Sequence, residues 1–193
     1  MFRQMFEDKK KLLVYLLAGI LITINWSTYI WAVNAGYVIQ TCMGYFIEPL
    51  MVCISGKIFF HEKMNNFKRS AIGFALVGLA IMIIGYREMP VIALGLALSF
   101  ASYAAIKKTY KLPVMQALFY ETAILVPIVL IIICYTELAG HGLAGNIETK
   151  KIILLSLCGI LTAAPMGLFS FAASKLPLVT LGLTEYLSPS ISL

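Results

Sequence analysis

The stretch LLVYLLAGILITINWSTYIWAV occupies residues 12–33 and contains no charged side chain. A helix needs about 20 predominantly apolar residues to cross a bilayer, so this stretch alone predicts a transmembrane helix. The rest of the 193-residue chain is similar, because 61% of its residues are hydrophobic and only 12% are charged. Soluble chains average roughly 45 to 50% and 25%. The sequence therefore predicts an all-α, polytopic membrane protein.

Six further apolar runs follow the first. The third and fourth runs are short, but the polar corner from Arg87 to Pro90 separates them. A proline disfavours helix in the residue before it, so a hairpin is expected there rather than one long helix. The six runs are 37–60, 70–86, 90–106, 114–135, 152–170 and 177–193.

The basic residues predict the orientation of these spans. Alternating the sides places twelve Lys and Arg at one face and only Arg87, Lys150 and Lys151 at the other. By the positive-inside rule, the N-terminus and the loops 61–69 and 107–113 are cytoplasmic. The basic clusters form no continuous face, which argues against nucleic acid as a partner. A basic start before an apolar run is also typical of a signal peptide, but this run is too long for one.

Shifted by 140 residues, the sequence matches itself through two consecutive spans. Tyr29, Trp31 and Ala32 fall on Phe169, Phe171 and Ala172, and Gln40, Phe46 and Pro49 fall on Thr180, Tyr186 and Pro189. Because the first span matches the sixth, the two copies cross the membrane in opposite directions. Such an inverted repeat is typical of secondary transporters, which bind substrate near the midplane between the two halves.

Several motifs resemble the RarD family of EamA-type transporters, within the drug/metabolite transporter superfamily. They are NWSTYIWAVNAG (25–36), GYFIEPL (44–50), SFASYAAIKK (99–108), ALFYETAILVP (117–127) and LPLVTLGLTEYLSPS (176–190). The resemblance implies a ten-helix permease of the bacterial cytoplasmic membrane, linked by name to chloramphenicol sensitivity. Where amides are expected in such proteins, this chain has Glu48 and Glu185.

The resemblance and the repeat together predict the organisation of the chain. Residues 1–11 are expected to be a cytoplasmic segment, and 12–86 the last three helices of the first EamA-like repeat. Residues 90–193 are expected to be the first four helices of the second repeat. A five-plus-five arrangement then lacks two N-terminal helices and one C-terminal helix.

Three acidic residues lie within predicted spans, namely Glu48, Glu121 and Glu185. An ionised side chain at the bilayer centre costs about 2.5 to 3.5 kcal/mol on insertion scales, so such groups usually face a polar cavity or become neutral. Under the repeat, Glu48 matches Ser188 and Tyr45 matches Glu185, so both carboxyl groups are expected in equivalent sectors of the two halves. We expect them to line a proton or substrate pathway, although each could instead hold the helix bundle together.

Other candidate site residues surround these carboxyl groups. Asn25, Trp26 and Tyr29 lie along one span, and Trp26 could stack on a planar substrate. Tyr45 and Thr184 share helix faces with the two carboxyl groups. Packing or interhelical bonding is an equal alternative for Asn25 and the aromatic residues. We also expect three helix-breaking prolines, Pro49, Pro165 and Pro189, and close-packing faces at Ala93, Ala97, Ala101 and Ala105 and at Ala71, Ala75, Gly78 and Gly85.

Three functions compete for this sequence. The first is a permease for small, partly apolar molecules, proton-coupled or facilitative, working by alternating access. The second is an intramembrane enzyme, which the chain argues against because no Asp lies in any span and both His61 and His141 lie in loops. The third is a fragment that inserts but transports nothing. We therefore predict a non-enzyme with no catalytic residues, cofactor or metal, whose partners are the lipid bilayer, a small-molecule substrate, protons and, as an open alternative, a second copy of the chain.

Overall fold

The structure is a computed structural model that describes residues 9–87, 89–110, 114–140, 148–187 and 191. Its elements are all α-helices, and the described residues contain no strand, which confirms the all-α prediction. The helices are α2 (Lys9–Asn34), α3 (Val38–Phe60), α4 (Asn66–Tyr86), α5 (Val91–Thr109), α6 (Val114–Leu138), α7 (Thr149–Lys175) and α8 (Leu178–Glu185).

Six of these helices, α2 to α7, are long and apolar enough to cross a membrane. They coincide with the first six predicted spans, so the chain is a multi-pass membrane protein. The seventh span begins where it was predicted, but its helix α8 covers eight residues. Of the remainder of that span, 188–190 and 192–193 lie outside the described residues.

The ends of α4 show how local capping sets the helix boundaries. Asn65 accepts a hydrogen bond from the Lys68 backbone N–H at 2.9 Å, so α4 begins at Asn66. The predicted loop 61–69 was therefore too long, and Lys68 and Arg69 lie in the first turn of α4. At the other end Arg87 has a φ of 60°, a left-handed conformation that ends the helix. The predicted hairpin between α4 and α5 is confirmed.

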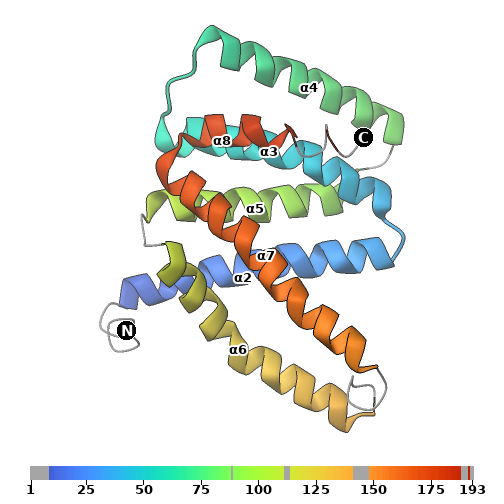
Figure 1. Ribbon diagram of the computed structural model, residues 1–193. Helices are drawn as coiled ribbons and strands as arrows, with labels where there is room; N and C mark the ends of the chain where they lie inside the picture. The colour runs from blue at the N-terminus through green and yellow to red at the C-terminus, as the bar shows by residue number, and fades with distance from the viewer. Residues whose placement is uncertain (1–8, 88, 111–113, 141–147, 188–190, 192–193) are drawn as a thin grey trace. The chain divides into compact units, whose positions relative to one another are not determined.

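The chain forms two compact units. The first contains Met1–Gly19 and Leu112–Phe171, and within it the rings of Tyr15 and Tyr120 meet edge to face at 5.0 Å. The second contains Ile20–Lys111 and Ala172–Leu193. In this second unit α3 lies between α4 and α5 (Figure 1) and also packs against α8.

Three of the four alanines predicted to form a packing face on α5 are buried, and the fourth, Ala105, is partly exposed. Ala93, Ala97 and Ala101 are each at most 2% exposed, and Ala93 and Ala97 form a core cluster with Met43 and Ile47 of α3. The matching prediction for α4 is wrong, because none of the described residues of α4 is buried. A stripe of small residues lets a neighbour approach closely but does not determine whether one does.

Candidate functional site

The candidate site forms where α3 and α8 cross in opposite directions. Tyr186 donates its hydroxyl hydrogen to the backbone carbonyl of Phe46 at 3.0 Å near one end of α8, and Cys53 of α3 lies 3.4 Å from the carbonyl of Val179 near the other end. Phe46 and Tyr186 are equivalent residues under the 140-residue repeat. A residue that contacts its own equivalent lies near the two-fold axis relating the two copies, as in any isologous contact.

Two glycines allow this crossing to be close. A Cβ atom added to Gly182 would lie 2.5 Å from the carbonyl oxygen of Pro49 and 2.8 Å from the sulfur of Cys53. One added to Gly56 would lie 2.9 Å from the Leu178 side chain. Such contacts are shorter than any side chain tolerates, so α3 and α8 approach each other through glycine.

The carboxyl groups of Glu48 and Glu185 lie at this crossing. Both oxygens of the Glu185 carboxyl group are buried, and among the described residues neither has a hydrogen-bond partner. Glu185 lies close enough to Glu48 for the two groups to interact electrostatically. A buried carboxylate without a partner is costly, and two adjacent ones repel each other. The site therefore suits a proton or a bound cation between the two groups.

Aromatic side chains form a row from α2 to α3 beside this crossing. The ring of Trp26 meets that of Tyr29 at 6.5 Å between centroids, and Tyr29 meets Tyr45 at 5.8 Å. Both contacts have edge-to-face geometry, which is favourable for aromatic pairs. Trp26 and Tyr45 remain 42% and 45% exposed, so the row is open along one side.

Asn25 bonds to α5. Its side-chain N–H groups donate to the Leu96 carbonyl at 2.8 Å and to the Ser99 hydroxyl at 3.0 Å. Both bonds run between helices, so Asn25 ties α2 to α5. This arrangement corresponds to the structural alternative proposed for Asn25.

Thr184 and the prolines occupy less central positions. Thr184 is exposed, and its hydroxyl donates to the Leu181 carbonyl in its own helix. Pro49 and Pro165 lie inside continuous helices, so the prediction that they break their helices is wrong. A proline removes only one backbone bond, and neighbouring groups in a membrane helix can compensate for it. Pro189 lies outside the described residues.

Glu121 lies in the other compact unit, and the structure does not relate its position to the Glu48 and Glu185 pair. It is 5% exposed within α6, where it interacts electrostatically with Tyr15 of α2. Gly19 packs against its backbone, because an added Cβ would lie 3.2 Å from the Glu121 carbonyl oxygen.

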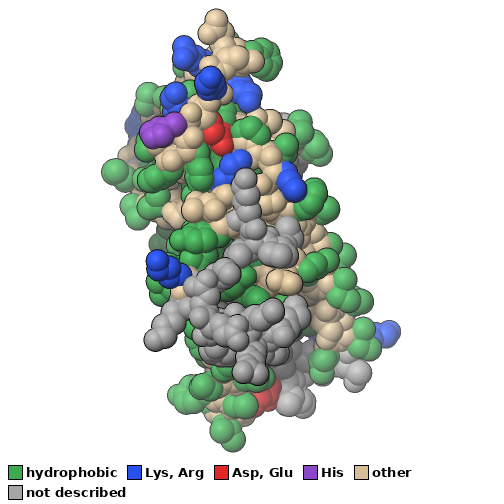
Figure 2. Space-filling model, turned by 90° about the vertical axis from the view of Figure 1, so that its left-hand side faces the viewer, with side chains coloured by type: hydrophobic (Ala, Val, Ile, Leu, Met, Phe, Trp, Pro, Cys, Tyr) green, Lys and Arg blue, Asp and Glu red, His purple; other side chains and the backbone are tan. Residues whose placement is uncertain are grey.

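Glu62, in the loop after α3, binds the start of α8, and this role was not predicted from the sequence. Its two carboxylate oxygens accept hydrogen bonds from the backbone N–H groups of Leu178 and Val179, at 2.8 and 2.9 Å. These are N–H groups of the first turn of α8, which carry no intrahelical partner. Lys108 lies 3.9 Å from the same carboxylate. Figure 2 shows Lys and Arg side chains beside an acidic side chain and a histidine on this face, between hydrophobic side chains.

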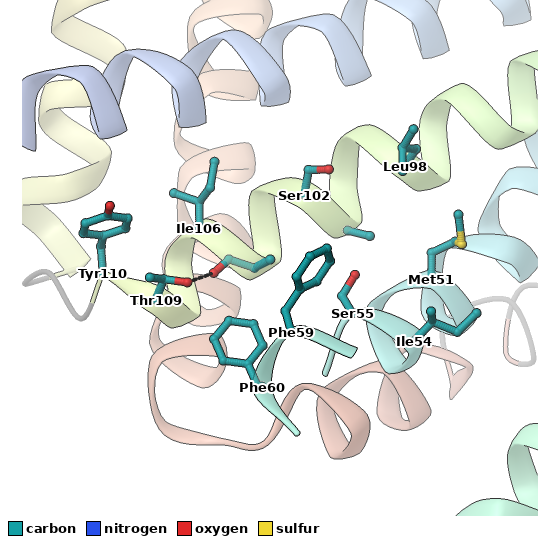
Figure 3. Close-up of a pocket in the computed structure, with 12 residues that line it drawn as sticks. Met51, Ile54, Ser55, Phe59, Phe60, Leu98, Ser102, Ile106, Thr109 and Tyr110 are labelled. Carbon is teal, nitrogen blue, oxygen red and sulfur yellow. Dashed lines mark hydrogen bonds between the residues drawn. The ribbon is translucent and has the colours of Figure 1, made fainter. Parts of the chain in front are cut away.

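An apolar groove of about 450 Å³ runs between the C-terminal halves of α3 and α5 (Figure 3). Phe59, Phe60 and Ile106 line it together with the hydroxyl-bearing residues Ser55 and Ser102. Neither Glu48 nor Glu185 lines this groove. Among the described residues, no three His, Cys, Asp or Glu side chains group as a metal site would require.

Comparison with known proteins shows which proteins this chain resembles. Residues 1–84 match the EamA-like transporter family. The chain is 39% identical to the uncharacterized transporter YojE of Bacillus subtilis, over 92% of this chain and 59% of that protein. It is 34% identical to the protein RarD of Streptomyces exfoliatus (97% and 59%) and 30% identical to the protein RarD of Escherichia coli (98% and 64%).

The chain thus spans about three fifths of the length of the curated relatives it matches. No solved structure matches it. The family match over residues 1–84 and the similarity to RarD proteins over nearly the whole chain agree with the six helices that are long and apolar enough to cross a membrane. The chain is similar over nearly its whole length to the RarD proteins and, over residues 1–84, to the EamA-like transporter family.

Proposed function

We propose that this protein moves small, partly apolar molecules across the bacterial cytoplasmic membrane by alternating access, with its N-terminus in the cytoplasm. Glu48 and Glu185 bind the proton that accompanies each cycle. The single observation that carries this proposal is the Glu185 carboxyl group, whose two oxygens are buried without a partner among the described residues and face the charge of Glu48.

The physical argument concerns how much charge this site can hold. With both groups ionised and no cation present, two like charges would lie in a medium that solvates them poorly. The pair therefore favours at least one proton or a cationic ligand. A proton taken up when the site faces one side of the membrane and released when it faces the other would couple proton flow to the change of state.

The position of the pair supports the same proposal. It lies beside the contact between Phe46 and Tyr186, the equivalent residues of the two repeat copies. Transporters built from inverted repeats bind substrates and coupling ions near this axis, because both states of the cycle share it. A structural pair would instead be expected to show hydrogen bonds from neighbouring helices to its carboxyl oxygens, which Glu185 lacks among the described residues.

The test replaces both groups by amides in the full-length chain. Accumulation of radiolabelled chloramphenicol, a small, partly apolar probe, is measured in cells at several external pH values. The wild type should change accumulation relative to empty cells in a pH-dependent way, whereas Glu48→Gln with Glu185→Gln should show no pH dependence. Glu137→Gln, which removes a carboxyl group elsewhere in the chain, is the control. An unchanged pH profile in the double variant would show the carboxyl pair to be structural, and a wild type identical to empty cells would contradict transport of this class of molecule.

A further inference from the structure

Equivalent residues of the two repeat copies form hydrogen bonds with the two ends of helix α4. At its start, the Lys68 ammonium donates to the Thr180 hydroxyl at 2.7 Å. At its end, the Gln40 side-chain amide donates to the Tyr86 hydroxyl at 3.2 Å. Gln40 and Thr180 are 140 residues apart, so the two copies hold opposite ends of one helix. This helix therefore extends across the two-fold axis of the repeat.

Between these two hydrogen bonds, Leu79 and Met82 of α4 pack against the core cluster of α3 and α5, and the rest of the helix is more exposed. None of its described residues is buried, and a Cβ atom added to Gly73, Gly78 or Gly85 would meet nothing within 4 Å. In Figure 1, α4 extends alongside α3 and α8, the two helices that cross at the site.

The space between α4 and the crossing is a cavity of about 730 Å³. This volume is within the range of about 300 to 1,000 Å³ that is usual for small-molecule sites. Phe46 and Tyr186, the pair at the two-fold axis, form its floor. Phe67, Phe74 and Gly78 of α4 also line it, and because Phe67 and Phe74 are 80% and 78% exposed, the cavity is open along α4.

The chemistry of the lining selects the class of ligand. Among the residues that the structure describes, no charged side chain lines the cavity, and the one hydroxyl group of the lining, that of Tyr186, already donates to the Phe46 carbonyl. Aromatic side chains stand on both walls, so a flat ring can make stacked or edge-to-face contacts on two sides. A flexible acyl chain would fill the same volume but would gain none of these contacts.

We propose that the open cavity lined by α3, α4 and α8 binds a flat, uncharged aromatic molecule. The proposal rests on the proposed function only in taking this molecule to be the transported cargo. Binding itself requires no transport, so the two can fail separately.

The experiment uses photolabelling of the full chain with 1-azidopyrene, a planar and uncharged probe. Protein reconstituted in phosphatidylethanolamine and phosphatidylglycerol vesicles is irradiated, and the labelled residues are mapped by mass spectrometry. Label should concentrate on the cavity lining, and excess pyrene should remove it. Gly78→Phe adds a large side chain to the cavity lining from a position with open space, and should reduce this label about tenfold, or about 1.4 kcal/mol of binding free energy.

Gly73→Phe provides the matched control, because Gly73 has equal space but does not line the cavity. It should leave the label unchanged. If Gly78→Phe does not yield monodisperse protein, Ala75→Leu fills the same cavity with a smaller side chain. Equal labelling of the wild type and the filled variant, or label spread over all exposed helix faces, would overturn the proposal in favour of a lipid-filled groove. Loss of label with unchanged chloramphenicol accumulation would overturn the cargo role alone.

Discussion

Removing the Glu62 carboxylate should release the N-terminal end of α8 from α3. The residue before this helix, Pro177, offers no side-chain cap, so the Leu178 and Val179 N–H groups depend on Glu62 at 2.8 and 2.9 Å. A hydrogen bond to a charged group contributes about 1.5 to 3 kcal/mol. The Glu62→Ala substitution removes two such bonds, and we expect a combined loss of about 3 kcal/mol because water satisfies the freed groups in part.

The rate at which the Cys53 thiol reacts with a thiol reagent measures how often α8 moves away from α3. Cys53 is 1% exposed and lies against the Val179 carbonyl, so a thiol reagent reaches it only when α8 moves away. Three kcal/mol corresponds to a rate increase on the order of 100-fold, since each 1.4 kcal/mol is a factor of ten. The other cysteines, Cys42, Cys134 and Cys158, are exposed and are first replaced by serine.

The comparison of variants separates capping from a general loosening of the loop. Glu62→Gln keeps the size of the side chain and one acceptor oxygen, so its rate should lie between those of the wild type and Glu62→Ala. Lys63→Ala perturbs the neighbouring exposed residue and should leave the rate unchanged. If Cys53 reacts in Glu62→Ala within about twofold of the wild-type rate, less than 0.5 kcal/mol is lost and the capping argument is refuted.

Three further outcomes follow from the described contacts. Gly182→Ala places a methyl group 2.5 Å from a carbonyl oxygen of α3 and should lower the unfolding temperature in scanning fluorimetry. The control Gly159→Ala, where an added methyl group has nothing within 4 Å, should leave that temperature unchanged. Equal unfolding temperatures for the two variants would refute the close crossing. Asn25→Ala loses two hydrogen bonds to α5 and should lower the free energy of unfolding by about 1 to 2 kcal/mol, measured by denaturant titration. An unchanged transition midpoint would show that these two bonds do not stabilise the fold. Lys63 and Glu148 are exposed, and each is replaced by a single cysteine in turn. In intact cells a cysteine at 63 should be shielded from an impermeant thiol reagent, whereas one at 148 should react. The reverse pattern would overturn the predicted orientation.

Much of the fold follows from the sequence because the bilayer restricts the alternatives. An apolar run of about 20 residues in a membrane can satisfy its backbone only as a helix, so six helices coincide with predicted spans. Helix ends were less accurate, since the cap at Asn65 adds a turn to α4 that polar residues had suggested was a loop. The periodic small residues of α5 and of α4 look alike in sequence, yet Ala93, Ala97 and Ala101 of α5 are buried and none of those of α4 is.

The candidate site could be predicted only where the repeat supplied long-range information. The repeat placed Glu48 and Glu185 in equivalent sectors, and the structure brings them within electrostatic reach of each other. It gave no means of finding Glu62, because the helix that this residue caps begins 116 residues further along the chain. Glu121 resembles the other two carboxyl groups in sequence, but it lies in a different compact unit.

The contact at the two-fold axis differs from the contacts that lie away from the axis. At the axis, Phe46 meets its own equivalent Tyr186, a contact that the exchange of the two copies leaves in place. Away from the axis the contacts are unequal, because Gln40 accepts from the Ile92 backbone N–H at 3.1 Å while its equivalent Thr180 accepts from a lysine. The proposed alternation between two states requires such inequality, since identical contacts at both ends would favour neither the inward-open nor the outward-open state. The hydrogen bonds at the two ends, rather than the tight crossing at the centre, are therefore the contacts expected to break and form in turn.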